Sequence, residues 1–131
     1  MTHKYIGTKE VLAWEQDKDD RPGYAVKYPD GYISWSPKEV FEAAYRVAEG
    51  SEQRLTFGDA IHFLKAGHRV ARTGWNGKGM WLEQQVPDEH SKMTLPYLYL
   101  NYPADAINTP GARVPWLAFQ TDVLAEDWVV L

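Results

Sequence analysis

The sequence contains no cysteine, and this absence removes several classes of function. Without thiols the chain has no disulfides, no thiolate metal sites and no cysteine nucleophile. It also lacks an apolar run long enough to span a membrane, and its polar start, MTHKYIGTKE, lacks the apolar stretch of a signal peptide. We therefore expect a protein that stays in the cytosol of the cell that makes it.

Positive charge is not in excess either. The chain has 14 Lys and Arg against 18 Asp and Glu, which gives a net charge of -4. A general nucleic-acid-binding protein needs a basic face to neutralise phosphates, so we expect no DNA or RNA polymer as a partner. A small anion can still be bound locally.

Residues suited to catalysis are few. None of the four serines lies in a nucleophile elbow, and His62 and His68 are six residues apart, which would place them on different sides of a helix and not together as metal ligands. General acid and base chemistry has the support of two acidic pairs alone, Glu83 with Asp88 and Asp122 with Asp127. A solvated strand edge and helix capping explain these pairs better. The sequence thus predicts no catalytic residue, no metal site and no cofactor.

Residues 1–50 predict a small subdomain of a β-hairpin and a helix. Residues 24–28 alternate as a strand does, PDG at 29–31 supplies the turn, and YISW returns as the second strand. Ser36 is the expected cap of a helix that has Pro37 at its first position and runs to about Ala48. The polar stretch EGSEQR follows, and we place a domain boundary between residues 50 and 51.

Residues 51–131 predict a second domain that begins with a helix. Thr56 is its expected cap with Asp59 three residues on, and Gly67 its expected terminator. The apolar positions of this helix share one face, which we expect to be core: Phe57, Ala60, Ile61 and Leu64. Strands are expected at 68–73, 80–86, 96–102 and from Trp128, with a short helical turn capped by Thr121. The predicted fold class is α+β, an antiparallel sheet with helices packed on one face.

The stretch RTGWNGKGMW at residues 72–81 is the best candidate for a binding site. It is no phosphate loop, because Lys78 is followed by Gly79 and a strand instead of Ser or Thr opening a helix. We expect Trp75, in a glycine-flanked turn, to be exposed and to stack on a ring, with Trp116 as a second aromatic plate. Glycine amides here, and the helix start at Thr121, favour an anion. This pattern suits a nucleotide-like ligand; the alternative is that both indoles fill the core.

Three segments carry a family resemblance. LTFGDAIHFLKAGHRVARTGWNGKGMWL, then PYLYL, then VPWLAFQTDVLAEDWVV together resemble the phage Thoeris anti-defence proteins of the second type, over residues 55–131. Residues 4–48 resemble a small domain that precedes such proteins or stands alone in phage genomes. The resemblance implies a non-catalytic protein acting in the cytoplasm of the infected bacterial host.

The resemblance also implies the ligand, the assembly and the site. Family members bind and hold intact the cyclic ADP-ribose-type signal of a TIR-domain enzyme, so that the Thoeris effector stays inactive. Some relatives also sequester cyclic dinucleotides or trinucleotides of CBASS defence at separate sites, and the proteins are homotetramers with ligand pockets between subunits. The site residues carried over to this sequence are Trp75, Asn76, Gly77, Lys78, Trp116, Gln120, Thr121 and Asp122. The long loop before Pro115 departs from the family pattern, so Asn108, Thr109 and Arg113 are expected to reshape the pocket rim or to form a second ligand site.

Two other functions remain open from the sequence. One is a hydrolase that degrades such a signal, supported by the acidic pairs alone. The other is a structural or interaction module of the phage particle that uses its tryptophans as interface anchors and binds no ligand.

Overall fold

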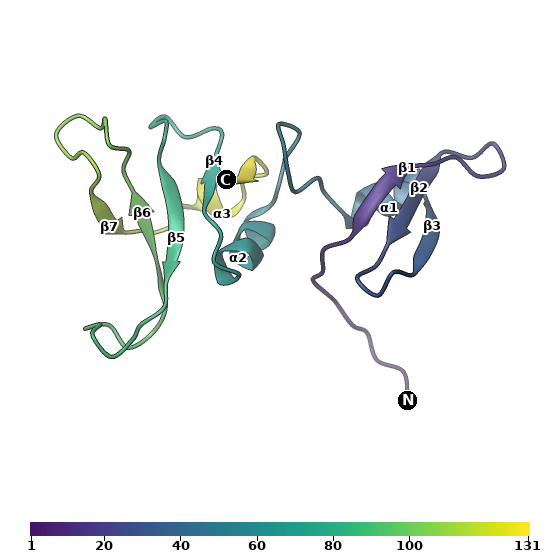
Figure 1. Ribbon diagram of the computed structural model, residues 1–131, viewed down its shortest axis with the longest axis horizontal. Coiled ribbons are helices and arrows are strands. Elements are labelled where there is room, and N and C mark those ends of the chain that lie inside the picture. Colours follow the sequence, from purple (N-terminus) through teal and green to yellow (C-terminus); the bar gives the residue numbers. More distant parts are fainter. The chain divides into compact units, whose positions relative to one another are not determined.

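The computed structural model describes all 131 residues, which form two compact units, Met1–Arg46 and Val47–Leu131. Each unit combines helix with an antiparallel sheet, so the predicted α+β class is confirmed (Figure 1). None of the helices is long and apolar enough to cross a membrane.

The first unit is a three-stranded antiparallel sheet with one short helix. Its strands pair in the order β1-β2-β3, and the sheet is followed directly by the helix. The elements are β1 (Leu12–Glu15), β2 (Gly23–Lys27), β3 (Ile33–Pro37) and α1 (Lys38–Ala44). The predicted hairpin is confirmed: Tyr28 N donates to Tyr32 O at 2.9 Å, and Gly31 has a φ of 90°, which favours glycine.

The predicted start and end of the first helix are wrong. Ser36 lies within β3 and its hydroxyl donates to Pro37 O, so it does not cap the helix. Pro37 itself occupies the cap position, and the helix ends at Ala44 instead of near Ala48. The ring of Pro37 cannot supply a hydrogen bond to a free amide, so the helix start is left without a side-chain cap.

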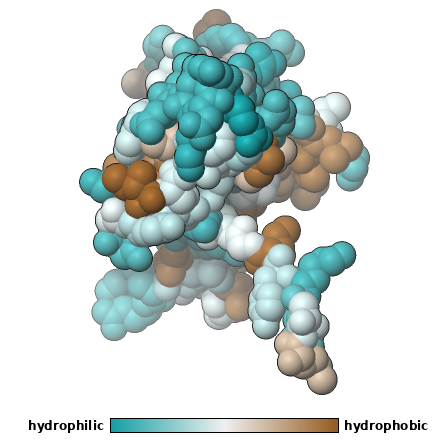
Figure 2. Space-filling view, turned by 90° about the vertical axis from the view of Figure 1, so that its right-hand side faces the viewer, coloured by the Kyte–Doolittle hydropathy of each residue, from teal (hydrophilic) through white to brown (hydrophobic).

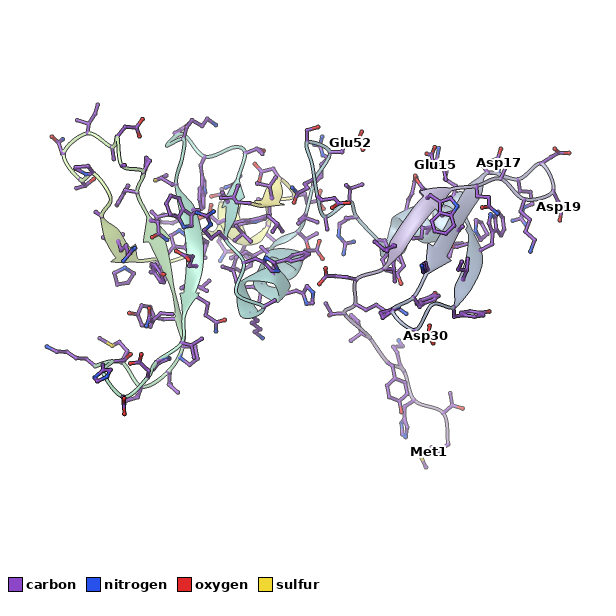
Figure 3. All side chains as sticks on the ribbon, viewed as in Figure 1. Met1, Glu15, Asp17, Asp19, Asp30 and Glu52 are labelled. Atoms are coloured by element: carbon purple, nitrogen blue, oxygen red, sulfur yellow. The ribbon has the colours of Figure 1, made fainter.

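One contact ties α1 to the sheet of the first unit. The ring of Tyr24 on β2 stacks on Phe41 with centroids 4.3 Å apart, and its hydroxyl donates to Glu42 at 2.6 Å. This bond raises the pKa of Tyr24 to about 12, because the carboxylate stabilises the protonated phenol. Other acidic side chains, Asp17 and Asp19, project from the loop between β1 and β2 (Figure 3).

The second unit is a five-stranded antiparallel sheet with two helices. The strand order is β7-β6-β5-β4-β8, and Figure 1 labels the first four of these strands. The elements are α2 (Phe57–Lys65), β4 (Val70–Arg72), β5 (Trp81–Gln85), β6 (Tyr97–Asn101), β7 (Arg113–Pro115), α3 (Gln120–Val123) and β8 (Trp128–Val130).

Helix α2 begins and ends where the sequence predicted. The Thr56 hydroxyl accepts from Asp59 N at 3.2 Å, and the Asp59 carboxylate accepts from Thr56 N at 3.0 Å. Gly67 adopts a φ of 93° just after the helix. The helix packs its apolar face on β4, β5 and β8, and the buried core comprises Leu55, Ala60, Phe63, Leu64, Val70, Leu82 and Trp128.

The second predicted cap is wrong. Helix α3 begins at Gln120 after Phe119, which places Thr121 inside the helix. Asp122 takes the capping role instead, because its side chain accepts from Phe119 N at 3.1 Å. The cap was misplaced because a threonine and an aspartate are both good hydrogen-bond acceptors near a helix start.

Large apolar side chains also reach the surface. On the face of the molecule shown in Figure 2, brown apolar areas lie between teal hydrophilic ones. Three such side chains flank α3 in the second unit: Leu117, Phe119 and Leu124 are 81%, 71% and 76% exposed. Of the three, Phe119 also lines the larger cavity of this unit.

Candidate functional site

A cavity of about 380 Å³ opens between three segments of the second unit. These are the end of β4 with the turn that follows it, strand β6, and the chain that enters α3. The lining residues are Arg72, Gly74, Trp75, Asn76, Gly77, Met80, Leu100, Trp116, Phe119, Thr121 and Asp122. The wall is thus largely aromatic and apolar, with a few polar groups, as in most small-molecule sites.

The two indoles of this wall belong to an aromatic cluster. Trp75 and Trp116 each pack against the fully buried Trp128, at centroid distances of 5.5 and 6.1 Å, and they lie 6.4 Å from one another. Phe57 of α2 closes the cluster. The expectation that these indoles are exposed is wrong: both are half-buried, because the turn folds back onto the core. Each nevertheless keeps a surface on the cavity.

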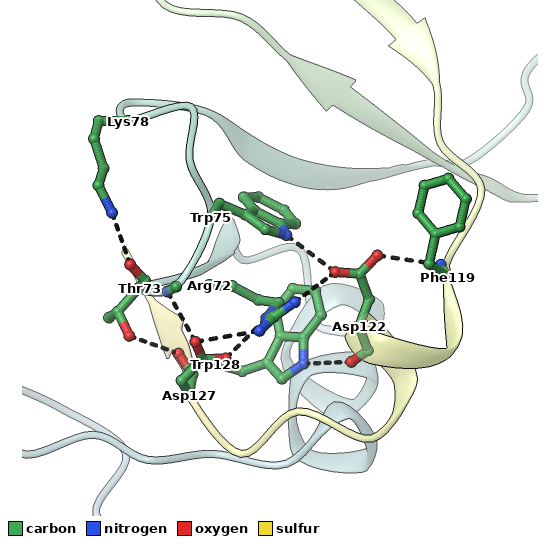
Figure 4. Close-up of polar contacts among 9 residues, drawn as sticks. Arg72, Thr73, Trp75, Lys78, Phe119, Asp122, Asp127 and Trp128 are labelled. Atoms are coloured by element: carbon green, nitrogen blue, oxygen red, sulfur yellow. Dashed lines mark hydrogen bonds and ion pairs between the residues drawn. The ribbon is translucent and has the colours of Figure 1, made fainter.

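Asp122 holds together groups from three segments around the cavity. Its Oδ1 accepts from Arg72 Nη1 at 2.8 Å and from Trp75 Nε1 at 3.1 Å, while its Oδ2 accepts from Phe119 N (Figure 4). Its own backbone oxygen accepts from Trp128 Nε1 at 3.0 Å. Asp122 is 5% exposed, so these bonds compensate for the removal of a carboxylate from water.

Asp127 holds the turn that carries Trp75. Its Oδ1 accepts from Arg72 Nε at 2.8 Å, and its Oδ2 accepts from Gly74 N at 2.8 Å. A side chain at position 74 would collide with this carboxylate, since a Cβ built there lies 2.5 Å from Asp127 Oδ2. Glycine is therefore required for the close approach of turn and carboxylate.

Arg72 joins the two carboxylates. It lies on β4 two residues after the buried Val70, so alternation directs both side chains to the same face of the sheet. The pKa of Arg72 is raised, and its hydrogen bond to the Asp127 carboxylate is the main cause. Burial raises the pKa of Asp122 and of Asp127, but the hydrogen bonds from Arg72 and from nearby N–H groups outweigh it, so both pKa values lie below the usual range.

Both turns that the sequence marks as favourable to an anion already hold one. The Gly74 amide is bound by Asp127, and the amide at the start of α3 is bound by Asp122. One amide in each of these turns is thus already bonded to a carboxylate of the chain itself.

The structure brings together six of the residues expected in the site and leaves the others outside. Lining the cavity are Trp75, Asn76, Gly77, Trp116, Thr121 and Asp122. Lys78 does not line it, because its Nζ donates to Thr73 O at 2.8 Å across the turn. Gln120 is exposed on α3, and Asn108 and Thr109 are exposed on the loop between β6 and β7.

Arg113 lies on the other face of the sheet. It pairs with Asn101 on β6, whereas the neighbouring Leu100 lines the cavity, and adjacent strand residues point to opposite faces. The Arg113 Nε donates to Asn101 Oδ1 at 3.2 Å. A hollow of about 160 Å³ adjoins it, lined by Gln85, Tyr97, Tyr99, Arg113, Val114 and Pro115.

Sequence reasoning missed the centre of the polar network. Asp127 and the lining residues Leu100 and Phe119 were not expected in the site, whereas Arg72, Gly74 and Met80 lie in the candidate stretch 72–81 but were not named as site residues. One signal was available: an arginine that follows a buried valine at a spacing of two on a strand must find a partner for its charge. That partner lies 55 residues further along the chain, and no local pattern identifies it.

Comparison with known proteins decides the family. The Thoeris anti-defense 2-like domain matches residues 55–131, all within the second unit and including the whole cavity. The chain belongs to the Thoeris anti-defense 2-like family. A relative, the Thoeris anti-defense 2 protein of Bacillus phage SP01, is 38% identical over 85 residues, which cover 60% of this chain and 96% of the relative. Family membership supports an anti-defence role.

Proposed function

We propose that this member of the Thoeris anti-defense 2-like family sequesters a nucleotide immune signal. The ligand is a cyclic ADP-ribose-type molecule made by a TIR-domain enzyme, and its capture keeps the Thoeris effector inactive in the cytoplasm of the infected host. The observation that carries the proposal is the aromatic cavity itself, which lies inside the segment that matches the family. Indoles bind the flat face of a base, and the neighbouring Asn76 and Thr121 offer hydrogen bonds to ribose hydroxyls.

The polar groups of the cavity favour binding over chemistry. Of the two acidic pairs that a hydrolase could use, the pair at the cavity, Asp122 and Asp127, is held by Arg72 and has lowered pKa values. A carboxylate in that state is a weak base and carries no proton to donate near neutral pH. This supports sequestration of an intact ligand over the alternative of a hydrolase.

The phosphates of such a ligand need a cation, and Lys78 is the candidate in this chain. Its Nζ is exposed and bound to a backbone oxygen alone, at the turn that forms one wall of the cavity. It can exchange that neutral oxygen for a phosphate, with a gain from charge pairing.

We further propose that a second copy of the chain completes the cavity, within a homotetramer. The volume of about 380 Å³ is near the lower limit for a small-molecule site, the exposed Phe119 lines it, and the exposed Leu117 and Leu124 flank the same short helix α3 in sequence. Apolar groups of this size at a surface mark interfaces. Sedimentation at micromolar concentration tests this assembly, and a monomer would contradict it.

We also propose a site for a second ligand class on the opposite face of the sheet. The hollow beside Arg113 is separate from the cavity, and a guanidinium beside two tyrosine rings suits a phosphate next to a base. We propose it as a site for cyclic dinucleotides or trinucleotides of CBASS defence. If this is correct, saturation with a cyclic ADP-ribose isomer leaves the binding of such an oligonucleotide unchanged, and Arg113→Ala weakens the oligonucleotide alone.

The main proposal is tested by recovery of the ligand. The protein is incubated with cyclic ADP-ribose isomers, separated from free ligand, denatured, and the released small molecule is identified by mass spectrometry. Recovery of the intact isomer is the expected result. A linear product would indicate the hydrolase, and no retained nucleotide would favour the interaction module.

A further inference from the structure

We propose that Arg72 is a positioning residue, which fixes the two walls of the cavity relative to each other and does not bind the ligand's phosphates. This inference rests on the proposed function, because it concerns the same cavity.

Each wall of the cavity is attached to Arg72 through one carboxylate. Asp127 binds the guanidinium and the Gly74 amide, and thereby anchors the turn that carries Trp75. Asp122 binds the guanidinium and the Phe119 amide, and thereby anchors the chain that enters α3. Arg72 thus bridges the two carboxylates, and the walls are also joined by the bond from Trp75 Nε1 to Asp122 Oδ1 (Figure 4).

Asp122 also fixes the orientation of Trp75. The indole Nε1 donates to the same Oδ1 that accepts from Arg72 Nη1. A ring that donates a hydrogen bond to a fixed acceptor cannot rotate freely about its side-chain bonds. Arg72 therefore orients the indole indirectly, through the Asp122 carboxylate that it binds. It does so before a ligand arrives.

The charge balance argues against a direct role in phosphate binding. One guanidinium faces two carboxylates, both of lowered pKa, so the group carries a net charge of -1 near neutral pH. The Arg72 side chain is 17% exposed, and its Nε and Nη1 are each 2.8 Å from a carboxylate oxygen. An incoming phosphate would have to compete with both carboxylates at short distance.

Two substitutions distinguish positioning from direct binding. Arg72→Lys keeps the positive charge but loses the planar fork that reaches both carboxylates. Asp127→Asn removes one negative charge next to the guanidinium and one anchor of the turn. If Arg72 bound the phosphates, the first change would largely preserve the affinity and the second would increase it. If Arg72 positions the walls, both changes weaken binding, by roughly tenfold or more, as expected when charge-assisted hydrogen bonds that hold a site are lost.

The probe is a cyclic ADP-ribose isomer, titrated calorimetrically into the full chain. Matched controls are Arg69→Lys, an exposed arginine that lies over the Trp81 ring, and Glu126→Gln, an exposed carboxylate next to Asp127 in sequence. Both controls should bind as the unchanged protein does. Unchanged or stronger binding by Asp127→Asn would overturn the inference.

A second measurement needs no ligand. In nitrogen-15 NMR spectra the Trp75 indole N–H and the Gly74 and Phe119 amides should exchange with solvent faster in Arg72→Lys and Asp127→Asn, while the buried Trp128 amide, bonded to Leu55 O, stays protected. Unchanged exchange at all three sites would show that Arg72 does not position the walls. If the unchanged protein binds no isomer, the proposed function fails, and the exchange rates still decide the role of Arg72.

Discussion

The indole Nε1 of Trp75 donates to Asp122 Oδ1 at 3.1 Å, across 47 residues of sequence. The candidate stacking residue and a buried carboxylate are therefore one unit. Any change at Trp75 acts on the polar network as well as on the aromatic wall, and its effects on binding and on stability must be separated.

Substitution at Trp75 separates them when two variants are compared. Trp75→Phe keeps a ring against Trp128 and removes the N–H donor, so the free energy of unfolding should fall by about 1 kcal/mol, the net value of a hydrogen bond. Trp75→Ala also loses the packing and should lower it by roughly 3 kcal/mol, with binding weaker by about 1 to 3 kcal/mol. Urea unfolding measures the change in stability, and calorimetric titration measures the change in binding. Equal stability of both variants would show that the indole packs little, and Trp14→Ala in the first unit serves as the control.

Acid should weaken the second unit through the two carboxylates bound to Arg72. Their folded pKa values are lowered, so their contribution to stability is fully present above the unfolded value of about 3.9 and is lost as the pH falls through the folded values. We expect a constant unfolding free energy near neutral pH and a decline below about pH 4. In Asp127→Asn that decline should be smaller. Asp88→Asn, on the exposed loop after β5, should leave it unchanged.

Tyr24 should ionise only at a pH well above the usual value for a tyrosine. Its folded pKa of about 12 lies above the unfolded value of about 10, so the bond to Glu42 stabilises the first unit below pH 10 and is lost as the pH rises through 12. In Glu42→Gln the Tyr24 pKa should return towards 10. Carbon-13 NMR of labelled tyrosine measures it, and an unchanged value would mean that the carboxylate does not cause the shift.

The second unit should fold by itself. We expect the fragment 47–131 to melt cooperatively and to bind the same ligand as the full chain, because its core and cavity lie within it. The fragment 56–131 is a sharper comparison. It lacks Gln53, whose side chain bonds to both N and O of Val130, and the buried Leu55, so it should melt at a lower temperature. Equal melting temperatures would show that these residues contribute nothing.

Local chemistry explains what the sequence predicted correctly. Thr56 and Asp59 form a reciprocal cap from residues three apart, and the turn at Gly31 depends on its own φ. The sequence singles out Trp75 and Trp116 because an indole in a glycine-rich or proline-flanked turn is unusual, and both line the cavity although neither is exposed. Such signals need no knowledge of the rest of the chain.

Long-range contacts explain what the sequence did not predict. Arg72 meets Asp122 and Asp127 at separations of 50 and 55 residues, so its role as the connection between two walls follows from the tertiary fold alone. Thr121 and Asp122 are adjacent and both able to cap, and only the path of the chain selects the aspartate.

The place of β8 bears on when this fold can form during synthesis. The backbone of Trp128, at the centre of the core, forms two hydrogen bonds with the backbone of Leu55. The backbone of Val130 forms two more with the side chain of Gln53, which lies 77 residues earlier. Leu64, Val70 and Leu82 leave the ribosome long before their common neighbour does. These apolar side chains stay exposed on the nascent chain until Trp128 emerges from the ribosome. During that period chaperones or neighbouring chains have access to them. A premature stop codon anywhere before Trp128 would make that exposure permanent.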